Sequence, residues 1–312
     1  MQKMAVDCRR QCRKIGFVPT MGFLHEGHIS LVRLARSEAD VVVLSIFVNP
    51  RQFGPKEDFE KYPHDLAWDS ELCRQNGVDI IFHPSVQAMY PGFRHRSGSY
   101  GGQVADSPPR SAMAERGANS SGGTVFIDEN DLSKQLCGAS RPGHFGGVLT
   151  VVGKLFNLVL PDVAVFGQKD AQQAVLVRHM INDLDFPVRM IVAPIIRESD
   201  GLAMSSRNAY LSPDERRDAT GLSAALKLAR RLYRSGERDY TVLKGAISDL
   251  ITKVKSAQID YIEIVGAHNL KPTHKIENED ILIALAVRIG NTRLIDNLPL
   301  PDDRLGNLLP EE

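Results

Sequence analysis

Two histidines three residues apart, His25 and His28, are the first residues of this sequence whose types and spacing could do chemistry. They occur in the run HEGH, where an apolar segment gives way to a helical pattern. If this turn is already helical, both rings lie on one side of it, above the unpaired N–H groups of the helix start. Such a helix end attracts phosphate, two imidazoles add donors, and Gly22 and Gly27 let a nucleotide approach the backbone. The motif predicts a polyphosphate site.

Two other interpretations of the histidine pair stay open. The rings could be solvent-exposed, or they could cap the helix without taking part in chemistry. A zinc site is less favoured, because the pattern lacks the i, i+4 histidine spacing and the carboxylate arrangement of HExxH.

A second polar cluster, GQKDAQQ at 167–173, directly follows the apolar run DVAVF. Lys169 is a compact cation suited to phosphate oxygens, and Asp170 could hold a ribose hydroxyl or a magnesium-bound water. Gln173, one helical turn further on, presents an amide toward the same place. An ordinary surface turn is the alternative interpretation of this cluster.

Two more clusters carry anion-binding or amide side chains. Ser205, Ser206 and Arg207 combine two hydroxyls with a planar guanidinium fork, which could clamp an anion or simply form a polar turn between domains. Asn49 and Gln52, in the run FVNPRQF, offer uncharged amides that could orient a hydroxy acid, although an ordinary Asn-Pro turn would look the same.

The elements that must position these residues form an alternating pattern. Residues 14–49 predict a βαβ unit, because two short β-branched apolar runs flank a segment with helical spacing. Helices near 65–76, 147–158 and 171–183 each lead into another apolar run. This alternation predicts an α/β fold with a doubly wound parallel sheet, Rossmann-like in form. All four clusters stand at or just beyond strand ends, where such sheets bind ligands, so we expect one nucleotide crevice with a small polar pocket.

The remainder of the chain predicts a second, smaller α+β domain. Two amphipathic helices, near 213–235 and 240–255, precede the strand-like runs IDYIEIV, ILIALAV and TRLID. An antiparallel sheet is favoured because only RIGN separates the last two runs. We expect one domain at 1–195, which holds the crevice, and a second at 196–312, which closes over the site. The Gly-, Ser- and Pro-rich segment 92–123 predicts a flexible insertion.

Composition and charge exclude several classes of protein. The 312 residues include 38 basic and 38 acidic ones, so no overall field favours nucleic acid. The sequence contains neither an apolar run of membrane-spanning length nor an N-terminal stretch typical of secretion, which predicts a cytoplasmic protein without a membrane partner. The four cysteines are too few and too irregularly spaced for a disulfide framework, and we expect reduced thiols.

Five stretches together resemble the pantothenate synthetase (pantoate–β-alanine ligase) family, which belongs to the nucleotidyltransferase superfamily with a HIGH-like motif. They are PTMGFLHEGH at 19–28, FVNPRQF at 47–53, RPGHF at 141–145, FGQKDAQQ at 166–173 and DGLAMSSRNAYL at 200–211. The resemblance spans residues 14 to about 297, in order and at suitable distances, apart from the segment near 92–123.

This resemblance implies a reaction and its partners. The pantoate carboxylate attacks the α-phosphate of MgATP, giving pantoyl adenylate and pyrophosphate, and the amine of β-alanine then displaces AMP to form pantothenate. ATP and Mg²⁺ are the implied cofactors, with Mg²⁺ held mainly by the ATP phosphates and not by a dedicated protein cage. The resemblance also implies a homodimer through the N-terminal domain.

The resemblance assigns roles to particular residues. His28 matches a proton donor, and it forms the expected catalytic group with His25, Lys169 and Arg207. The expected ATP-binding residues are Met21, Gly22, Phe23, Leu24, His25, Glu26, Gly27, His28, Gly167, Gln168, Lys169, Asp170, Ile196, Met204, Ser205, Ser206 and Arg207. The expected residues for pantoate and β-alanine are Gln52, Gln173, Asn49, Tyr62, Arg141 and His144.

Two departures from the family pattern affect the expected ATP site. Phe23 stands where many members have alanine, and Ala171 stands where others have an aromatic residue.

Three alternative functions stay open: a nucleotidylyltransferase that stops after nucleotide transfer, a class I aminoacyl-tRNA synthetase and a catalytically silent nucleotide sensor. The nucleotidylyltransferase is disfavoured because it needs a cationic acceptor pocket, whereas the expected pocket has neutral amides. The synthetase is disfavoured because the chain has no net charge that would favour nucleic acid. The sensor is disfavoured because it would not need the polar substrate pocket.

Overall fold

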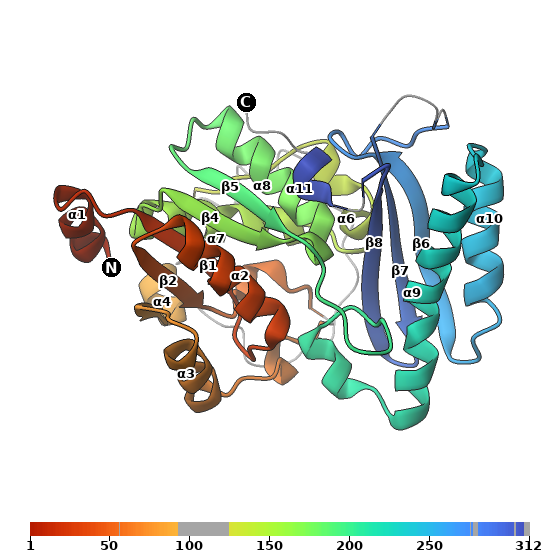
Figure 1. Ribbon diagram of the computed structural model, residues 1–312. Helices are drawn as coiled ribbons and strands as arrows, with labels where there is room; N and C mark the ends of the chain where they lie inside the picture. Colours follow the sequence, from red (N-terminus) through yellow and green to blue (C-terminus); the bar gives the residue numbers. More distant parts are fainter. Residues whose placement is uncertain (56, 93–124, 275, 277–279, 303, 309–312) are drawn as a thin grey trace, which may run out of the picture.

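The first part of the chain forms a parallel sheet, which is five-stranded in the described residues and has the order β3-β2-β1-β4-β5 (Figure 1). The computed structural model describes residues 1–55, 57–92, 125–274, 276, 280–302 and 304–308. β1 pairs with β2 along its whole length and with β4 on its other side. The strands are β1 (Ile15–Thr20), β2 (Val41–Ile46), β3 (Ile80–Phe82), β4 (Val163–Gly167) and β5 (Arg189–Ala193).

Helices cover both faces of this sheet, because its apolar strands have no solvent-exposed side. Alternate residues of one strand face opposite ways, so Phe17 lies in one core cluster and Val18 in another. The Phe17 cluster includes side chains of α1, α7 and α8, whereas the Val18 cluster includes side chains of α2 and α3. The helices of this part are α1 (Gln2–Arg10), α2 (Glu26–Glu38), α3 (Leu66–Gln75), α4 (Val86–Met89), α6 (Cys137–Ser140), α7 (His144–Val159) and α8 (Ala171–Asp183).

The second part of the chain forms an antiparallel sheet in the order β6-β7-β8. β6 (Ala257–Gly266), β7 (Ile281–Ile289) and β8 (Thr292–Leu300) follow the long helices α9 (Pro213–Arg234) and α10 (Tyr240–Ile251). One face of β7, including Ile283 and Leu285, packs against α9 and α10. The other face, including Leu282 and Ala284, joins the core cluster of the first sheet, so the small sheet lies between its own helices and the large domain (Figure 1).

Short 3₁₀ helices and a last α-helix complete the described chain. The elements are η1 (Pro50–Gln52), η2 (Phe59–Lys61), η3 (Leu132–Lys134), η4 (Gln168–Asp170), η5 (Ser206–Tyr210) and α11 (Leu305–Leu308). One of the 3₁₀ helices, η4, directly joins β4 to α8 at the carboxyl edge of the large sheet.

The predicted fold class is confirmed, with a doubly wound parallel sheet and a smaller antiparallel one. The start of α7 and the presence of α1 differ from expectation. α7 begins at His144 and not near 147, because Gly143 adopts a left-handed conformation at its N-cap (φ 81°). α1 was not expected, although Ala5 and Cys8 repeat at helical spacing and are buried.

Segment 92–123, expected to be a flexible insertion, lies outside the described residues except for Gly92. Within the described part of the chain, no helix is long and apolar enough to span a bilayer.

Candidate active site

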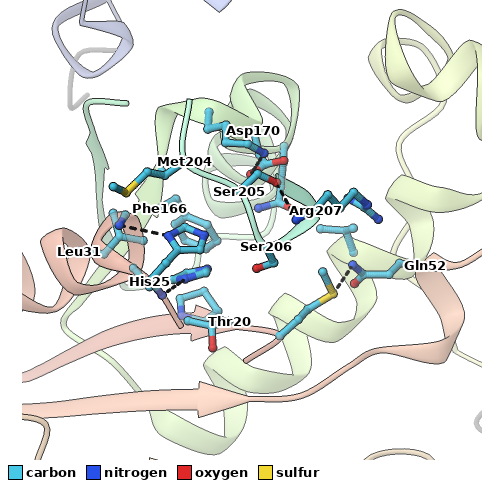
Figure 2. A pocket seen from close by; sticks show the side chains of 18 of the residues that line it. Thr20, His25, Leu31, Gln52, Phe166, Asp170, Met204, Ser205, Ser206 and Arg207 are labelled. Atoms are coloured by element: carbon cyan, nitrogen blue, oxygen red, sulfur yellow. Dashed lines mark hydrogen bonds and ion pairs between the residues drawn. The ribbon is translucent and has the colours of Figure 1, made fainter. Parts of the chain in front are cut away.

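A cavity of about 230 Å³ opens at the carboxyl ends of β1, β2, β4 and β5. The strand order reverses between β1 and β4, so the loops after these two strands diverge and leave a crevice between them. Figure 2 shows His25 and Met204 on one side of this cavity and Gln52 on the opposite side. The sequence-predicted residues that line it are Met21, His25, Gly27, His28, Gln52, Tyr62, Arg141, His144, Gly167, Lys169, Asp170, Gln173, Ile196, Met204, Ser205, Ser206 and Arg207.

The two histidines cap helix α2 reciprocally. His25 is the N-cap residue, and its Nδ1 accepts a hydrogen bond from the N–H of Gly27 at 3.1 Å. The Nδ1 of His28 accepts from the N–H of His25 at 3.3 Å. We expected both rings to stand above unpaired N–H groups. For the N–H groups of His25 and Gly27 this is wrong, because the imidazoles themselves accept hydrogen bonds from them. Each ring is held by a backbone group of the loop that carries it.

This capping determines where each imidazole carries its proton. A neutral ring whose Nδ1 accepts a hydrogen bond has its N–H at Nε2. Burial and the charge of Lys169 lower the pKa of His25 to about 4, and burial, His25 and Lys169 lower the pKa of His28 well below its ordinary value. The ring centroids are 4.1 Å apart. At neutral pH the pair therefore consists of two uncharged Nε2–H donors.

Lys169 stands on a turn that the second sheet holds in place. Its Nζ lies 4.0 Å from a carboxylate oxygen of Asp170, and both residues line the cavity. Asn297 of β8 donates from Nδ2 to the carbonyl oxygens of Gln168 (2.9 Å) and Lys169 (3.1 Å). The N–H of Leu305 donates to Oε1 of Gln168 at 3.0 Å. Gln168 is thus a buried anchor of the turn and does not line the cavity.

Arg207 reaches the cavity from η5 and forms a two-pronged ion pair with Asp58. Its Nε and a terminal nitrogen lie 3.1 and 3.0 Å from the two carboxylate oxygens. Burial alone would raise the pKa of Asp58, but the hydrogen bonds and charge of Arg207 outweigh it and hold the pKa below its ordinary value. Ser205 caps η5 by accepting from the N–H of Arg207, and Ser206 donates to the carbonyl of Phe23 at 3.4 Å. These contacts join the segment before α9 to the histidine loop.

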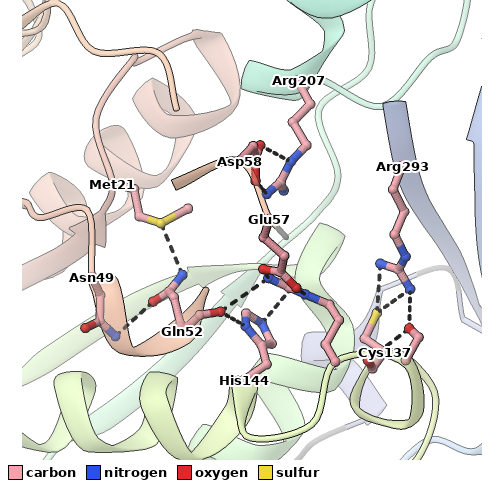
Figure 3. A network of polar contacts seen from close by, with 11 residues as sticks. Met21, Asn49, Gln52, Glu57, Asp58, Cys137, His144, Arg207 and Arg293 are labelled. Atoms are coloured by element: carbon pink, nitrogen blue, oxygen red, sulfur yellow. Dashed lines mark hydrogen bonds and ion pairs between the residues drawn. The ribbon is translucent and has the colours of Figure 1, made fainter. Parts of the chain in front are cut away.

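A second ion pair lies beside the first, because its acidic residue, Glu57, precedes Asp58 in the chain (Figure 3). Arg141 donates to both carboxylate oxygens of Glu57, at 2.7 and 2.6 Å, and to Nε2 of His144 at 2.9 Å. The Nδ1 of His144 lies 2.7 Å from the carbonyl oxygen of Gln52, which can only accept, so this ring carries its proton on Nδ1. Burial and the charge of Arg141 lower the pKa of His144 to about 4. The neutral ring therefore fixes the backbone of Gln52.

The side chain of Gln52 is fixed separately, by Asn49. Asn49 donates from Nδ2 to Oε1 of Gln52 at 3.2 Å and to the carbonyl oxygen of Gly147 at 3.0 Å. Its Oδ1 accepts from the hydroxyl of Tyr90 at 3.0 Å. The Nε2 of Gln52 points to the sulfur of Met21, 3.1 Å away. Asn49 is 1% exposed and lies behind the cavity wall, so its amide supports Gln52 and does not face a ligand.

Four other expected ATP-binding residues do not line this cavity. Phe23 and Leu24 line a smaller cavity of about 150 Å³, to which His25 also contributes. The carboxylate of Glu26 pairs with Arg33 along α2. The remaining one, Gly22, has a left-handed backbone (φ 83°) in the loop before α2.

The floor of the cavity is apolar. Val148, Val151, Val152 and Leu155 project from one face of α7, and Phe166 comes from β4. Such a surface favours a ligand with a compact hydrocarbon part beside its polar groups. Among the described residues, no group of three His, Cys, Asp or Glu side chains is arranged to hold a metal ion.

Sequence reasoning missed four polar residues that hold the site together: Glu57, Asp58, Asp69 and Asn297. Glu57 and Asp58 stand in the run PKEDFEK, which is typical of a solvated charged loop. Asp69 and Asn297 lie within an expected helix and next to an expected strand. No local pattern distinguishes these residues, because each acts on a partner more than 40 residues away in the sequence.

Comparison with known proteins agrees with this architecture. Residues 1–299 match the family described as pantoate-beta-alanine ligase. The pantothenate synthetase of Thermotoga petrophila is 50% identical over 297 residues, 95% of each chain, and that of Moorella thermoacetica is 49% identical over 94% of this chain and 93% of the relative. The solved pantothenate synthetase of Thermus thermophilus matches with a TM-score of 0.80 at 39% identity, covering 94% of this chain and 96% of that one. A Francisella tularensis pantoate-beta-alanine ligase complexed with beta-gamma ATP and beta-alanine matches with a TM-score of 0.68 at 33% identity, covering 95% and 94%.

Proposed function

Since the chain belongs to the pantoate–β-alanine ligase family and is an ATP-dependent ligase that joins pantoate to β-alanine, we propose that it works through a pantoyl adenylate made inside the cavity. In the first step an oxygen of the pantoate carboxylate bonds to the α-phosphorus of ATP, and the bond from that phosphorus to the pyrophosphate oxygen breaks. In the second step the amine of β-alanine bonds to the acyl carbon, AMP leaves, and the amine loses a proton. The products are pantothenate, AMP and pyrophosphate.

The histidine side of the cavity is the proposed ATP phosphate site. In-line attack at the α-phosphorus develops negative charge on the departing pyrophosphate, and donors placed there in advance lower the barrier. His25 and His28 supply neutral Nε2–H donors, and Lys169 supplies a positive charge. Ser205 and Arg207 stand across the same cavity and complete the set of donors. No protein nucleophile is needed, because the carboxylate of pantoate is itself the nucleophile.

The amide side of the cavity is the proposed pantoate site. Pantoate has two hydroxyls, a carboxylate and a carbon bearing two methyl groups. Gln52 and Gln173 offer neutral amides to the hydroxyls and carboxylate, while the valines of α7 offer an apolar surface to the methyl groups. Tyr62, Arg141 and His144 line the same part of the cavity, where β-alanine would enter. Holding the carboxylate and the phosphorus in line supplies the remainder of the acceleration.

Magnesium fits this proposal as a partner of the ATP phosphates. The carboxylate of Asp170 is half-exposed beside Lys169 in the cavity and is a suitable oxygen donor to a magnesium-bound water. Bound Mg²⁺ would neutralise part of the triphosphate charge and leave the protein donors to act on the charge that develops during the reaction.

The observation that carries the proposal is that one cavity brings the cationic and N–H donors of three separate segments to face the amides Gln52 and Gln173. The test is to mix the enzyme with MgATP and pantoate but without β-alanine. We expect about one equivalent of pyrophosphate per site and an acyl adenylate that survives acid quenching, and β-alanine should then discharge it to AMP and pantothenate. Pyrophosphate release only in the presence of β-alanine, or formation of ADP and phosphate, would rule out this mechanism.

Three organisational features belong to the same proposal. The unit from residue 196 onward closes over a site built by residues 1–195, which is supported by Ile196 and Met204 lining the cavity. The enzyme forms a homodimer through its first unit, where Val125 and Phe126 expose apolar side chains (81% and 61% exposed). It works in the cytoplasm, consistent with its four free cysteines.

A further inference from the structure

The loop that carries the two histidines has an unusual backbone. Gly22 and Phe23 both have left-handed conformations, with φ of 83° and 53°. For a residue with a side chain this conformation is disfavoured and persists only where surrounding contacts impose it. The next residues lead directly to His25, the N-cap of α2. Whatever holds Phe23 in this conformation therefore also sets the position of the histidine pair.

Asp69, in the first turn of α3, makes the contacts that hold it. One carboxylate oxygen of Asp69 accepts from the N–H of Phe23 at 2.8 Å, and the other accepts from the N–H of Leu24 at 2.7 Å. The residue is 1% exposed, so a buried carboxylate uses both oxygens on two consecutive amides of the histidine loop. Hydrogen bonds to a charged acceptor are about twice as strong as those between neutral groups.

The neighbouring amides are held in the same manner. The hydroxyl of Thr20 accepts from the N–H of Gly22 at 3.2 Å and donates to the carbonyl of Ser45 at 2.7 Å. The N–H of His25 donates to His28. Every amide from residue 22 to residue 25 thus has a side-chain acceptor, and Asp69 supplies two of the four from a separate helix. The carboxylate also fits closely, because a Cβ added at Gly22 would lie 2.9 Å from Oδ2 of Asp69.

We propose that Asp69 is a positioning residue for adenylation: its carboxylate fixes the left-handed turn at Phe23 and thereby aims the Nε2–H groups of His25 and His28 into the cavity. The proposal rests on the proposed function of these two histidines as donors to ATP. Asp69 does not line the cavity and touches no substrate. Its effect is transmitted through the backbone of two residues to the N-cap of α2.

The test compares three side chains at position 69. Asp69→Asn keeps the shape but can accept only one of the two amide hydrogen bonds, since its NH₂ group faces the other N–H. Asp69→Glu keeps the carboxylate but changes the length. We therefore expect the adenylation rate to be highest with Asp, lower with Glu and lowest with Asn at position 69. The Asp69→Asn enzyme should be slower than wild type by about 10- to 100-fold, because displacing a catalytic group by about 1 Å costs about that much in rate. A purely space-filling role predicts the order Asp, Asn, Glu.

Two further readouts separate positioning from loss of fold. Pantoate affinity should stay within about twofold of wild type, because Gln52 and Gln173 lie on other segments. In protein labelled with ¹⁵N-histidine and free of ligand, the Nδ1 signals of His25 and His28 should lose their acceptor character in Asp69→Asn. Asp65→Asn is the matched control: Asp65 caps the same helix by accepting from the N–H of Trp68 at 2.9 Å, and it should leave both readouts unchanged.

The outcomes are distinguishable. Wild-type histidine signals in a folded Asp69→Asn protein overturn the positioning role, whatever the rate. Altered signals with a wild-type rate overturn the link to adenylation and remove the histidines from the proposed mechanism. If Asp69→Asn does not fold, Gly22→Ala takes its place. Its new Cβ would lie 2.9 Å from both Oδ2 of Asp69 and Cγ2 of Ile46, on a left-handed backbone, so the turn must shift although Asp69 is still present. Unchanged signals and rate in this variant overturn the proposal as well.

Discussion

Adjacent glycines at the start of α7 should respond in opposite ways to substitution by alanine. A Cβ at Gly147 would lie 2.4 Å from the carbonyl oxygen of Arg51 and 2.8 Å from the amide nitrogen of Gln52. Both are backbone atoms, so η1 would have to retreat by roughly 0.6 Å or more, and overpacking of this kind costs about 1–3 kcal/mol. The gain in helix propensity returns only about 0.5–1 kcal/mol. We expect Gly147→Ala to lower the free energy of unfolding by about 1–2 kcal/mol.

The same displacement should also weaken pantoate binding. Asn49 bridges the carbonyl oxygen of Gly147 and the side chain of Gln52, so moving η1 away from α7 disturbs both ends of this bridge. The KM for pantoate should rise about tenfold, while the KM for ATP changes little, because Gln52 lies on the side of the cavity away from the histidines. Steady-state kinetics with each substrate varied in turn, and denaturant unfolding, measure the two effects.

Gly146→Ala is the matched control for this experiment. Its Cβ would meet only the carboxylate of Asp128, at 3.0 Å, and this exposed side chain can rotate away. This variant should be as stable as wild type or more stable by up to about 0.5–1 kcal/mol, with unchanged pantoate kinetics. If Gly147→Ala behaves in the same way as Gly146→Ala, the close packing of η1 on α7 does not hold Gln52, and the reasoning fails.

Three further changes test the proposed site. His28→Ala should slow adenylate formation by about 100-fold with folding retained, and a near wild-type single-turnover rate would exclude the ring from the reaction. Gln173→Ala should cost about 1–3 kcal/mol in pantoate-dependent steps and leave ATP affinity unaltered, as equilibrium binding of each ligand would show. The pKa of His144 is about 4 when folded against 6.5 ordinarily, so between these values the unfolded chain binds more protons and stability should fall as the pH is lowered. Melting curves from pH 7 to pH 4 should show a shallower fall for His144→Gln, and equal slopes would contradict the assignment.

The fold could be predicted from the sequence to the extent that its signals are local. The fully buried run 41–46 and the amphipathic pattern of α2 depend on neighbours within one element, and both were expected. The sequence also predicted that most site residues lie together, because the carboxyl ends of parallel strands all meet at one edge of the sheet. The antiparallel second sheet was predicted from the short RIGN connection between β7 and β8.

The remainder depended on contacts that no local pattern encodes. Asn49 and Gln52 looked equivalent as amides after a strand, yet one is fully satisfied behind the wall and the other lines the cavity. The difference arises from Gly147 and Tyr90, which meet Asn49 only in the folded chain. Glu57 looked like a solvated charge for the same reason, because its partner is 84 residues away.

The pairing of β1 with β4 has a consequence for the order of folding. Gly16 lies opposite Val163, so this pairing closes a stretch of about 150 residues, and contacts of such long range form slowly because the closure entropy must be met first. The histidine loop follows one of these strands and the Lys169 turn follows the other. Neither the histidine loop alone nor the Lys169 turn alone offers a nucleotide more than a few hydrogen-bond donors. ATP should therefore bind only after the two strands have met, and it should slow unfolding of the enzyme without speeding its folding.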